Sequence, residues 1–553
     1  MRAGRPLLVL QLAGTQAEMG HQHGELLARA GGYGETVAFY RRMPEILMGK
    51  ERGGLPEPLL RPLVRFALLG LHRGRPPELR ERSRAFFEAL GYPRRFSHHL
   101  FVMDLLQNVV GLAGHFGIGA SRRLLANAAI PACSSVAVWG RASRDGTLRH
   151  ARNFDFPGTG IWEQQPTVVF NSPDRGLRYG FVATRGADTP GVTAFNEAGL
   201  TLGAHTRFHR HVRFSGAGIV DLGHEIIRRA ETLADAARIA RERKVASTWG
   251  LLVSSAREKS AALLEVTGRA VEVIRPAPGE DFLVQTNRYR SAALREWEVA
   301  PMTGFLANSD GRARALRSRV LASSGLDAGD LRAALGGREC PETAEERPCG
   351  GVLAQPISVQ SVVTEPEARV LHVSVGPSPT GLGPWALVPM KWESVGSRVV
   401  EPPEAEKGAG AAHAAFVAAV GLDGRGAPRS EVAAALERVV TLDPEEPIYR
   451  LLAGALALRS GDASRALEHF RRGLVGERAP FRRATLLLWA ARAARVGGRV
   501  EEARVFTAEL LAVEHPLAHD LKAQARREGE RALPARKLGR IVVNLVFPDV
   551  MLA

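Results

Sequence analysis

The chain has 553 residues and a formal net charge of +16, so it is long enough for a large core and two or three domains. Arginine supplies nearly all of the 74 basic residues, and these are spread along the chain without a recognisable binding module, so no nucleic-acid partner is expected. Three cysteines exclude a disulfide scaffold, and no run approaches the roughly 18 apolar residues that a membrane span requires.

The first apolar run, residues 6–12, follows a basic start and admits two interpretations. It is either a first β-strand or the apolar part of a signal peptide. A glutamine interrupts the run and structured-looking sequence follows, so we favour the strand and a cytoplasmic protein. Thr15 and Glu18 have capping-box spacing and predict a helix from residue 15. His21 and His23 do not share a face of this helix, so no metal is expected there.

Residues 35–130 have a helical, arginine-rich pattern, with apolar residues spaced as on a helix around 59–69. Residues 101–110 form another apolar helix, interrupted by Asp104 and Gln107. Residues 127–131 then form a short linker into the next segment.

The most informative stretch is residues 132–156, which predicts a β-hairpin. Its first strand begins at Ala132-Cys133, and a polar turn follows at 143–146. Its second strand carries Arg152 and Asp155 in the sequence Arg-Asn-Phe-Asp. Direct pairing of the two strands would bring these side chains within reach of the cysteine. The alternative is a small buried cysteine at a strand start, which is the commoner role of a lone cysteine.

The following residues alternate between strands and helices. Asn196 lies in the turn Asn-Glu-Ala-Gly between two strands, and Asn287 follows the strand end at Thr286. A helix is expected to begin near residue 308 with Ser309 as its N-cap. A helix with a second helical turn folded in is predicted over 219–242. Strands are predicted over 167–170, 179–183, 191–202, 250–254, 261–265, 270–274 and 282–286, with a further hairpin over 359–376.

Two groups of residues invite a metal or redox interpretation. His205, His209 and His211 lie in an arginine-rich stretch that disfavours a cation, so we expect pocket-rim or surface residues. Cys340 and Cys349 lie in a polar loop, where two unpaired thiols are the default in a reducing cell and a disulfide or redox lid is the alternative. No metal and no cofactor are expected.

The composition changes after residue 400. The Pro/Glu/Gly-rich segment 401–410 predicts a linker, and 411–530 is rich in Ala, Leu and Arg. Prolines recur there at 444, 480 and 516, and glycines at 461 and 497, both at intervals of 36. This period resembles that of tetratricopeptide repeats. The tail, 531–553, contains an apolar stretch over 540–548 that reads as a strand or an apolar strap.

Taken together and in this order, the Cys-Ser-Ser start, the Arg-Asn-x-Asp group, the Asn-Glu-Ala-Gly turn and the Thr-Asn strand end resemble the C45 family of N-terminal-nucleophile hydrolases. These are the relatives of isopenicillin N acyltransferase and, more distantly, of the choloylglycine hydrolases. The resemblance implies an α+β fold, a four-layer αββα sandwich, to which the C-terminal helical-repeat domain is added. It divides the chain into a mostly helical pro-segment over 1–132 and a catalytic core over 133–400.

The resemblance also implies an activity and its residues. The precursor would cut itself between Ala132 and Cys133, and Cys133 would then transfer an acyl group from a small amide or acyl-thioester substrate to water or an amine. Arg152 would favour the thiolate and Asp155 would hold the freed ammonium. The resemblance further implies that Asn196 and Asn287 serve the oxyanion and that Arg312 lies near the site.

The chemistry of such a site is simple. A freed α-amino group has a pKa of about 7.7–8.0, so part of it is neutral and accepts the thiol proton. Two alternatives remain open. One is a non-catalytic scaffold that binds a protein partner through its helical repeats. The other is a cysteine hydrolase with an internal nucleophile, which would need a histidine near Cys133.

Overall fold

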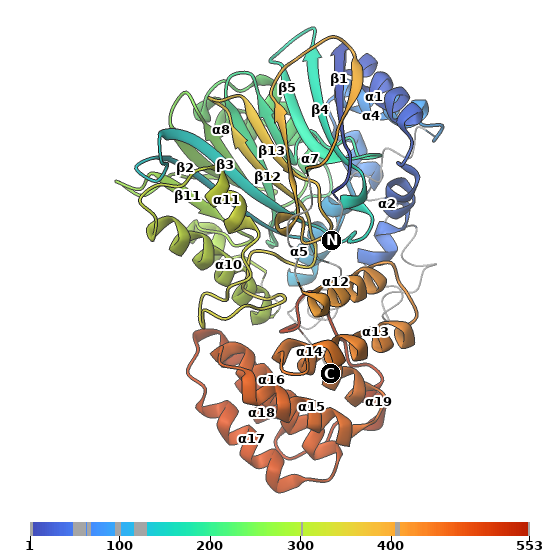
Figure 1. Ribbon diagram of the computed structural model, residues 1–553, viewed down its shortest axis with the longest axis vertical. Coiled ribbons are helices and arrows are strands. Elements are labelled where there is room, and N and C mark those ends of the chain that lie inside the picture. The colour runs from blue at the N-terminus through green and yellow to red at the C-terminus, as the bar shows by residue number, and fades with distance from the viewer. Residues whose placement is uncertain are drawn as a thin grey trace.

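The computed structural model describes residues 4–47, 62, 68–93, 101–115, 130–299, 302–403 and 410–550. Figure 1 shows two β-sheets with flanking helices in one part of the molecule and a helical region, coloured orange to red, in the other. Much of the predicted linker over 401–410 and much of the predicted helical pattern around 59–69 lie outside the described residues, as do 127–129.

The larger sheet contains nine strands within the described residues, in the order β10-β9-β8-β7-β6-β5-β4-β1-β15. Adjacent strands are antiparallel except β1 and β4, which are parallel. The strands are β1 (Leu7–Gly14), β4 (Pro166–Pro173), β5 (Tyr179–Thr184), β6 (Thr193–Asn196), β7 (Leu200–Thr206), β8 (Trp249–Ser255), β9 (Ser260–Val266), β10 (Val271–Ile274) and β15 (Gly396–Val400).

The smaller sheet is antiparallel throughout, and its six strands in the described chain follow the order β11-β2-β3-β12-β13-β14. They are β2 (Ala132–Gly140), β3 (Gly146–Asp155), β11 (Phe282–Gln285), β12 (Ser358–Glu365), β13 (Val370–Ser374) and β14 (Trp385–Pro389). The predicted hairpins over 132–156 and 359–376 are therefore confirmed as β2–β3 and β12–β13.

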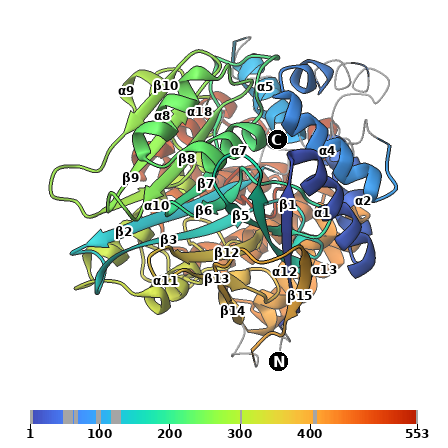
Figure 2. The same ribbon diagram turned by 90° about the horizontal axis from the view of Figure 1, so that it is seen from above.

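The two sheets pack face to face and each carries helices on its outer face (Figure 2). Between the sheets, residues such as Val168 and Phe170 of β4 pack against Leu371 and Val373 of β13. On the outer face of the smaller sheet lie α10 (Thr303–Leu321) and α11 (Ala328–Leu335). The outer face of the larger sheet is covered by α1 (Gln16–Ala30), α4 (Pro77–Ala89), α5 (Val102–His115), α7 (Ile219–Arg229) and α8 (Leu233–Glu242). This arrangement is the predicted α+β fold, a four-layer αββα sandwich.

The N-terminal part of the chain is built into this sandwich. β1 lies between β4 and β15, so the predicted pro-segment contributes a strand to the larger sheet in addition to helices. Thr15 and Glu18 form the predicted capping box at the start of α1 (Gln16–Ala30). The other helices described there are α2 (Gly34–Leu47), α4 (Pro77–Ala89) and α5 (Val102–His115).

Two local predictions need correction. The segment 219–242 forms two helices, α7 (Ile219–Arg229) and α8 (Leu233–Glu242), and Thr232 caps the second. Ser309 is not an N-cap, because α10 begins at Thr303, after the extended residue Met302, and Ser309 lies inside the helix. Its hydroxyl instead accepts a hydrogen bond from the backbone N–H of Asn287 at 3.0 Å.

The helical region consists of consecutive helices whose buried faces form a separate apolar cluster. Its helices are α12 (Ala411–Gly424), α13 (Arg429–Leu442), α14 (Pro447–Arg459), α15 (Ala463–Gly476), α16 (Pro480–Val496), α17 (Val500–Ala512), α18 (His519–Glu528) and α19 (Ala535–Leu538). The tetratricopeptide assignment and the predicted domain limits stay predictions. None of the helices in the described ranges has the length and apolarity needed to cross a membrane.

Candidate active site

Cys133 is the second residue of β2, and the register of the hairpin decides which side chains reach it. Cys133 lies opposite Phe154, Ser135 lies opposite Arg152, and Ala132 lies opposite Asp155. Residues two apart on a strand share a face, so Cys133 and Arg152 point to the same side of the sheet. Nη2 of Arg152 is 3.5 Å from Sγ of Cys133.

Arg152 is held in place by the larger sheet. Its guanidinium donates hydrogen bonds to the carbonyl of Ala204 on β7, at 2.5 Å, and to the carbonyl of Val192. The side chain is buried, so its charge is only weakly screened by water. These contacts fix one cation beside the sulfur.

The thiol of Cys133 is buried, with 1% of its surface exposed. Burial raises the pKa of this thiol above its ordinary value, and Arg152 opposes the rise. In this environment the sulfur therefore carries its proton at neutral pH. A thiolate would require a nearby base to accept that proton.

Asp155 is buried behind the hairpin. Its Oδ1 accepts a hydrogen bond from the hydroxyl of Ser358 at 2.6 Å, and its Oδ2 lies 4.0 Å from Nη1 of Arg312. Burial raises the pKa of this carboxyl, while Arg312 lowers it. Among the described residues, Oδ2 has no hydrogen-bond partner, which leaves one buried oxygen free to accept a bond.

The side chains of Asn287 and Arg312 bind the backbone of Cys133. Oδ1 of Asn287 accepts hydrogen bonds from the backbone N–H of Cys133 at 3.0 Å and from Nη2 of Arg312 at 2.7 Å. Nη1 of Arg312 donates to the carbonyl of Cys133 at 2.7 Å and to the hydroxyl of Ser134 at 2.8 Å. The nitrogen of the predicted scissile bond is thus directly bound to the Asn287 side chain.

The structure does not bring Asn196 to the residues around Cys133. Its Nδ2 donates to the carbonyls of Ile227 and Ala230 near the end of α7, both at 2.9 Å, and its Oδ1 accepts from the backbone N–H of Leu200. Its amide joins the β6–β7 turn to α7, so the side chain is committed to the backbone. The predicted oxyanion role does not fit this arrangement.

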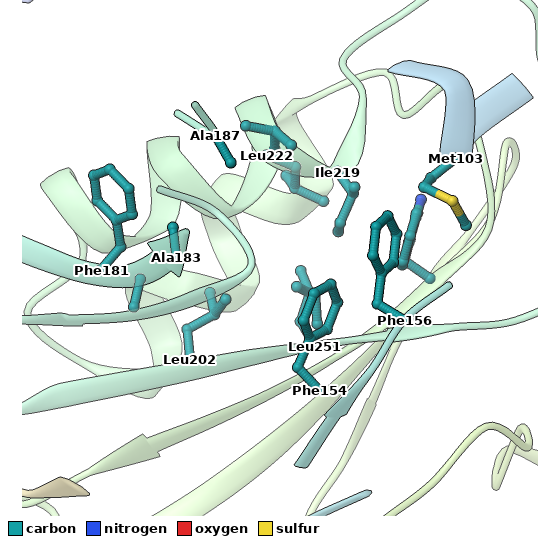
Figure 3. Close-up of a cluster of buried hydrophobic side chains, with 14 of the residues drawn as sticks. Met103, Phe154, Phe156, Phe181, Ala183, Ala187, Leu202, Ile219, Leu222 and Leu251 are labelled. Atoms are coloured by element: carbon teal, nitrogen blue, oxygen red, sulfur yellow. The ribbon is translucent and has the colours of Figure 1, made fainter. Parts of the chain in front are cut away.

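Two cavities meet at the beginning of β2. The first is apolar and is lined by Cys133 together with Tyr40, Met103, Phe154, Phe156, Trp162 and Trp249. Figure 3 shows Phe156 beside Met103 and Ile219. Ile219 also lines this cavity. The second adjoins Ala132, Asn287 and Arg312, and its walls contain both charged and aromatic side chains.

Several residues that support the side chains around Cys133 were not identified as site residues from the sequence. Ser358 supports Asp155, from which it is 203 residues distant in the chain. The carbonyl of Thr206 accepts a hydrogen bond from Nδ2 of Asn287 at 3.0 Å, and Thr206 lines both cavities. Asn308 accepts from Nε of Arg312 at 2.9 Å. A serine or threonine at a strand end is too common to signal such a role without its partners.

The histidine prediction is wrong for two of three residues. His205 and His209 are fully buried, not rim or surface residues, because β7 and the segment after it are covered on both sides. Burial lowers the pKa of His205 well below its ordinary value. Among the residues that the structure describes, no three His, Cys, Asp or Glu side chains are placed to hold a metal ion. Cys340 and Cys349 are free, buried thiols.

The four-layer αββα sandwich and the cysteine at the start of a hairpin strand are the features that the resemblance predicts. Residues 143–322 match the family model described as Acyl-coenzyme A:6-aminopenicillanic acid acyl-transferase. The match runs from the β2–β3 turn through α10, so it includes Arg152, Asp155, Asn287 and Arg312 and begins after Cys133. It confirms the resemblance to the C45 family and supports an amidohydrolase or acyltransferase activity.

Solved structures show more distant likenesses. An N-acylethanolamine-hydrolyzing acid amidase ortholog from Caenorhabditis elegans is 15% identical, with 42% of this chain and 93% of that chain covered and a TM-score of 0.31. Two variants of conjugated bile acid hydrolase from Clostridium perfringens are 11% and 9% identical, and each comparison covers 49% of this chain. Their own chains are covered by 96% and 97%, with TM-scores of 0.35 and 0.34. No curated relative matches the sequence.

Proposed function

We propose that this protein is a self-processing cysteine N-terminal-nucleophile hydrolase or acyltransferase that cuts itself between Ala132 and Cys133. The observation that carries the proposal is the placement of Cys133 between two sets of groups. Arg152 lies 3.5 Å from its sulfur, and Asn287 binds its backbone nitrogen at 3.0 Å. A cysteine that was only a core residue would not need both contacts.

The first reaction is the cut itself. The sulfur of Cys133 attacks the carbonyl carbon of Ala132, the C–N bond breaks, and the thiol proton passes to the freed nitrogen. Water then hydrolyses the resulting thioester and leaves a carboxylate on Ala132. Asn287 and Arg312 hold the nitrogen and the carbonyl of Cys133 during this step.

The cut creates the base that the uncut chain lacks. The new α-amino group is partly neutral near pH 8 and accepts the thiol proton, and the nearby Arg152 cation stabilises the thiolate. The free Oδ2 of Asp155 is a buried acceptor for the ammonium that forms. Removing one peptide bond therefore turns an inert thiol into a nucleophile with its own base.

Acyl transfer then follows in two steps. The thiolate attacks the carbonyl of a small amide or acyl thioester, and the amine or thiol leaves with a proton. Water or an amine attacks the acyl-Cys133 thioester, and the C–S bond breaks. The apolar cavity beside the sulfur favours substrates with an apolar acyl group, since its walls are almost entirely aromatic and aliphatic.

The helical region carries the second part of the proposal. We infer that residues 411–530 form tetratricopeptide-like repeats after a linker at 401–410. The alternative to an enzyme is a non-catalytic scaffold that binds a protein partner through these repeats. Cytoplasmic location likewise stays a prediction.

Intact-mass analysis of the purified protein tests the proposal. The wild-type chain should give two fragments that separate between Ala132 and Cys133, and Cys133→Ala should remain one chain of about the full 59.7 kDa. Cys349→Ala, which changes another buried free thiol, is the matched control and should be cut normally. An uncut wild-type chain that does not react with activated acyl donors would favour the non-catalytic scaffold.

A further inference from the structure

The segment 541–550, here called the strap, connects the helical region to the sandwich. Ile541, Val543 and Leu545 are buried in the apolar cluster of the helical region. Val542, Phe547 and Val550 are buried in the main core cluster of the sandwich. The strap therefore has two apolar faces and packs against both parts of the molecule. Figure 1 shows the red end of the chain on the side of the helical region that faces the sheets.

Polar contacts fix the strap in one position. Asp549 accepts a hydrogen bond from Nη2 of Arg482 on α16 at 2.8 Å, and both side chains are buried. The side chain of Asn544 accepts hydrogen bonds from the backbone N–H groups of Val546 and Phe547, at 3.1 and 3.0 Å. These bonds hold the turn that directs Phe547 inward.

The strap also packs closely against α10, the helix that carries Arg312. A Cβ atom at Gly304 would lie only 2.5 Å from the carbonyl oxygen of Asp549, so only a glycine allows this approach. The rings of Phe305 and Phe547 are 5.0 Å apart, at a distance typical of stabilising aromatic pairs. Phe547 is thereby held in the wall of the second cavity.

The second cavity is the place where a leaving or attacking amine would bind, if Cys133 is the nucleophile that we propose. The α-amino group of Cys133 must exchange a proton with that amine, so the two nitrogens must come within hydrogen-bond distance. The Cys133 nitrogen is bound by Asn287, and Asn287 lines the second cavity together with Ala132 and Arg312. The apolar cavity on the side of the sulfur is left for the acyl group.

We propose that Phe547, supplied by the strap, determines the size of the amine that this enzyme accepts. Its ring lines the amine cavity together with Asn287 and Arg312. The helical region anchors the strap through the contact between Arg482 and Asp549. The inference rests on the proposed function of Cys133. It assigns the helical region a role within the same chain, which is to complete the acceptor side of the active site.

The test uses the full-length protein with p-nitrophenyl octanoate as acyl donor. The thiolate attacks the ester carbonyl, the C–O bond breaks and p-nitrophenolate leaves. The acceptors are methylamine, benzylamine and 1-naphthylmethylamine. The amine nitrogen attacks the thioester, the C–N bond forms as the C–S bond breaks, and the amine proton passes to the sulfur through the α-amino group. Chromatography of the three octanoyl amides gives the rate ratio of the large to the small amine.

Phe547→Ala enlarges the cavity and should raise the ratio for 1-naphthylmethylamine over methylamine about tenfold, the scale on which apolar pockets discriminate size. Phe547→Trp should lower the same ratio. Phe506→Ala removes a similarly buried ring from α17 that does not line the cavity, and its ratio should equal that of the wild type. A purely structural role would change total activity and leave the ratio unchanged.

The outcomes separate this inference from the proposed function. A p-nitrophenolate burst that is equal in wild type and Cys133→Ala refutes the function and the inference together. A Cys133-dependent burst without any amide product refutes the inference alone, as does an unchanged ratio in both Phe547 variants. If Phe547→Ala does not fold, Phe547→Trp and Phe547→Leu decide the result by the same ratio.

Discussion

The contact between Arg152 and Cys133 makes a quantitative prediction about the reactivity of the sulfur. Arg152→Met keeps most of the length of the side chain and removes the cation. Opposite unit charges about 4 Å apart interact by about 4 kcal/mol at an effective dielectric constant of about 20. Measured effects of one neighbouring charge are commonly smaller, so the loss should be about 1.4–4 kcal/mol, or about 10- to 1000-fold in the thiolate population at a fixed pH.

The rate of alkylation of Cys133 by iodoacetamide reports that population. The rate is measured from pH 6 to about 10 by intact mass, which also separates cut from uncut protein, so that each form is compared with itself. Arg152→Lys keeps a cation and should retain most of the wild-type rate, because the charge is the cause. Equal pH profiles for Arg152→Met and wild type would refute the idea that this guanidinium controls the thiolate.

Three further predictions follow from individual contacts. Ser358→Ala removes the hydrogen bond to Asp155, so the pKa of that carboxyl should rise and the acid limb of the activity profile should move to higher pH; an unmoved limb would exclude Asp155 from the rate-controlling ionisation. Gly304→Ala should lower the free energy of unfolding by about 1–3 kcal/mol in urea titrations, because its methyl group overlaps the carbonyl of Asp549. Burial alone would raise the pKa of Asp188, but Arg82 and His23 hold it well below the ordinary value. The stability from this buried pair is therefore present above pH 4 and is lost as the pH falls further. Arg82→Met should cost about 3–5 kcal/mol at pH 7 by leaving the charge unpaired, and less at pH 3, where part of the stability from the pair has already been lost. An equal loss at both pH values would contradict this.

The local features of the fold were predictable because they depend on residues close together in the chain. The capping box at Thr15 and the β2–β3 hairpin both follow from spacings within about 20 residues. The hairpin register then places Arg152 on the same face as Cys133, and hydrogen bonds to Val192 and Ala204 fix its guanidinium beside the sulfur. The errors in these local predictions concerned where an element begins or ends. For example, α10 begins at Thr303, so Ser309 lies inside the helix and is not its N-cap.

The choice of partners across the fold was less predictable. Arg312 lies among several arginines on α10, and only its buried position selects it, since Arg314 and Arg317 form exposed ion pairs with Glu342 and Glu280. Asn196 has the expected sequence context but is turned towards α7, because the carbonyls at the end of that helix need donors. A short polar motif does not say which of several neighbours will bind it.

The sequence by itself determined the hairpin, the cysteine with its arginine and aspartate, and the Thr-Asn strand end, because backbone pairing and strand alternation act over short distances. Only the tertiary structure decided that Ser358 supports Asp155, that Asn287 and Arg312 hold the backbone of Cys133, and that Phe547 lines the cavity beside Ala132. These contacts join segments that are far apart in the chain, and they arise because both sheets and the helical region must bury their apolar faces together.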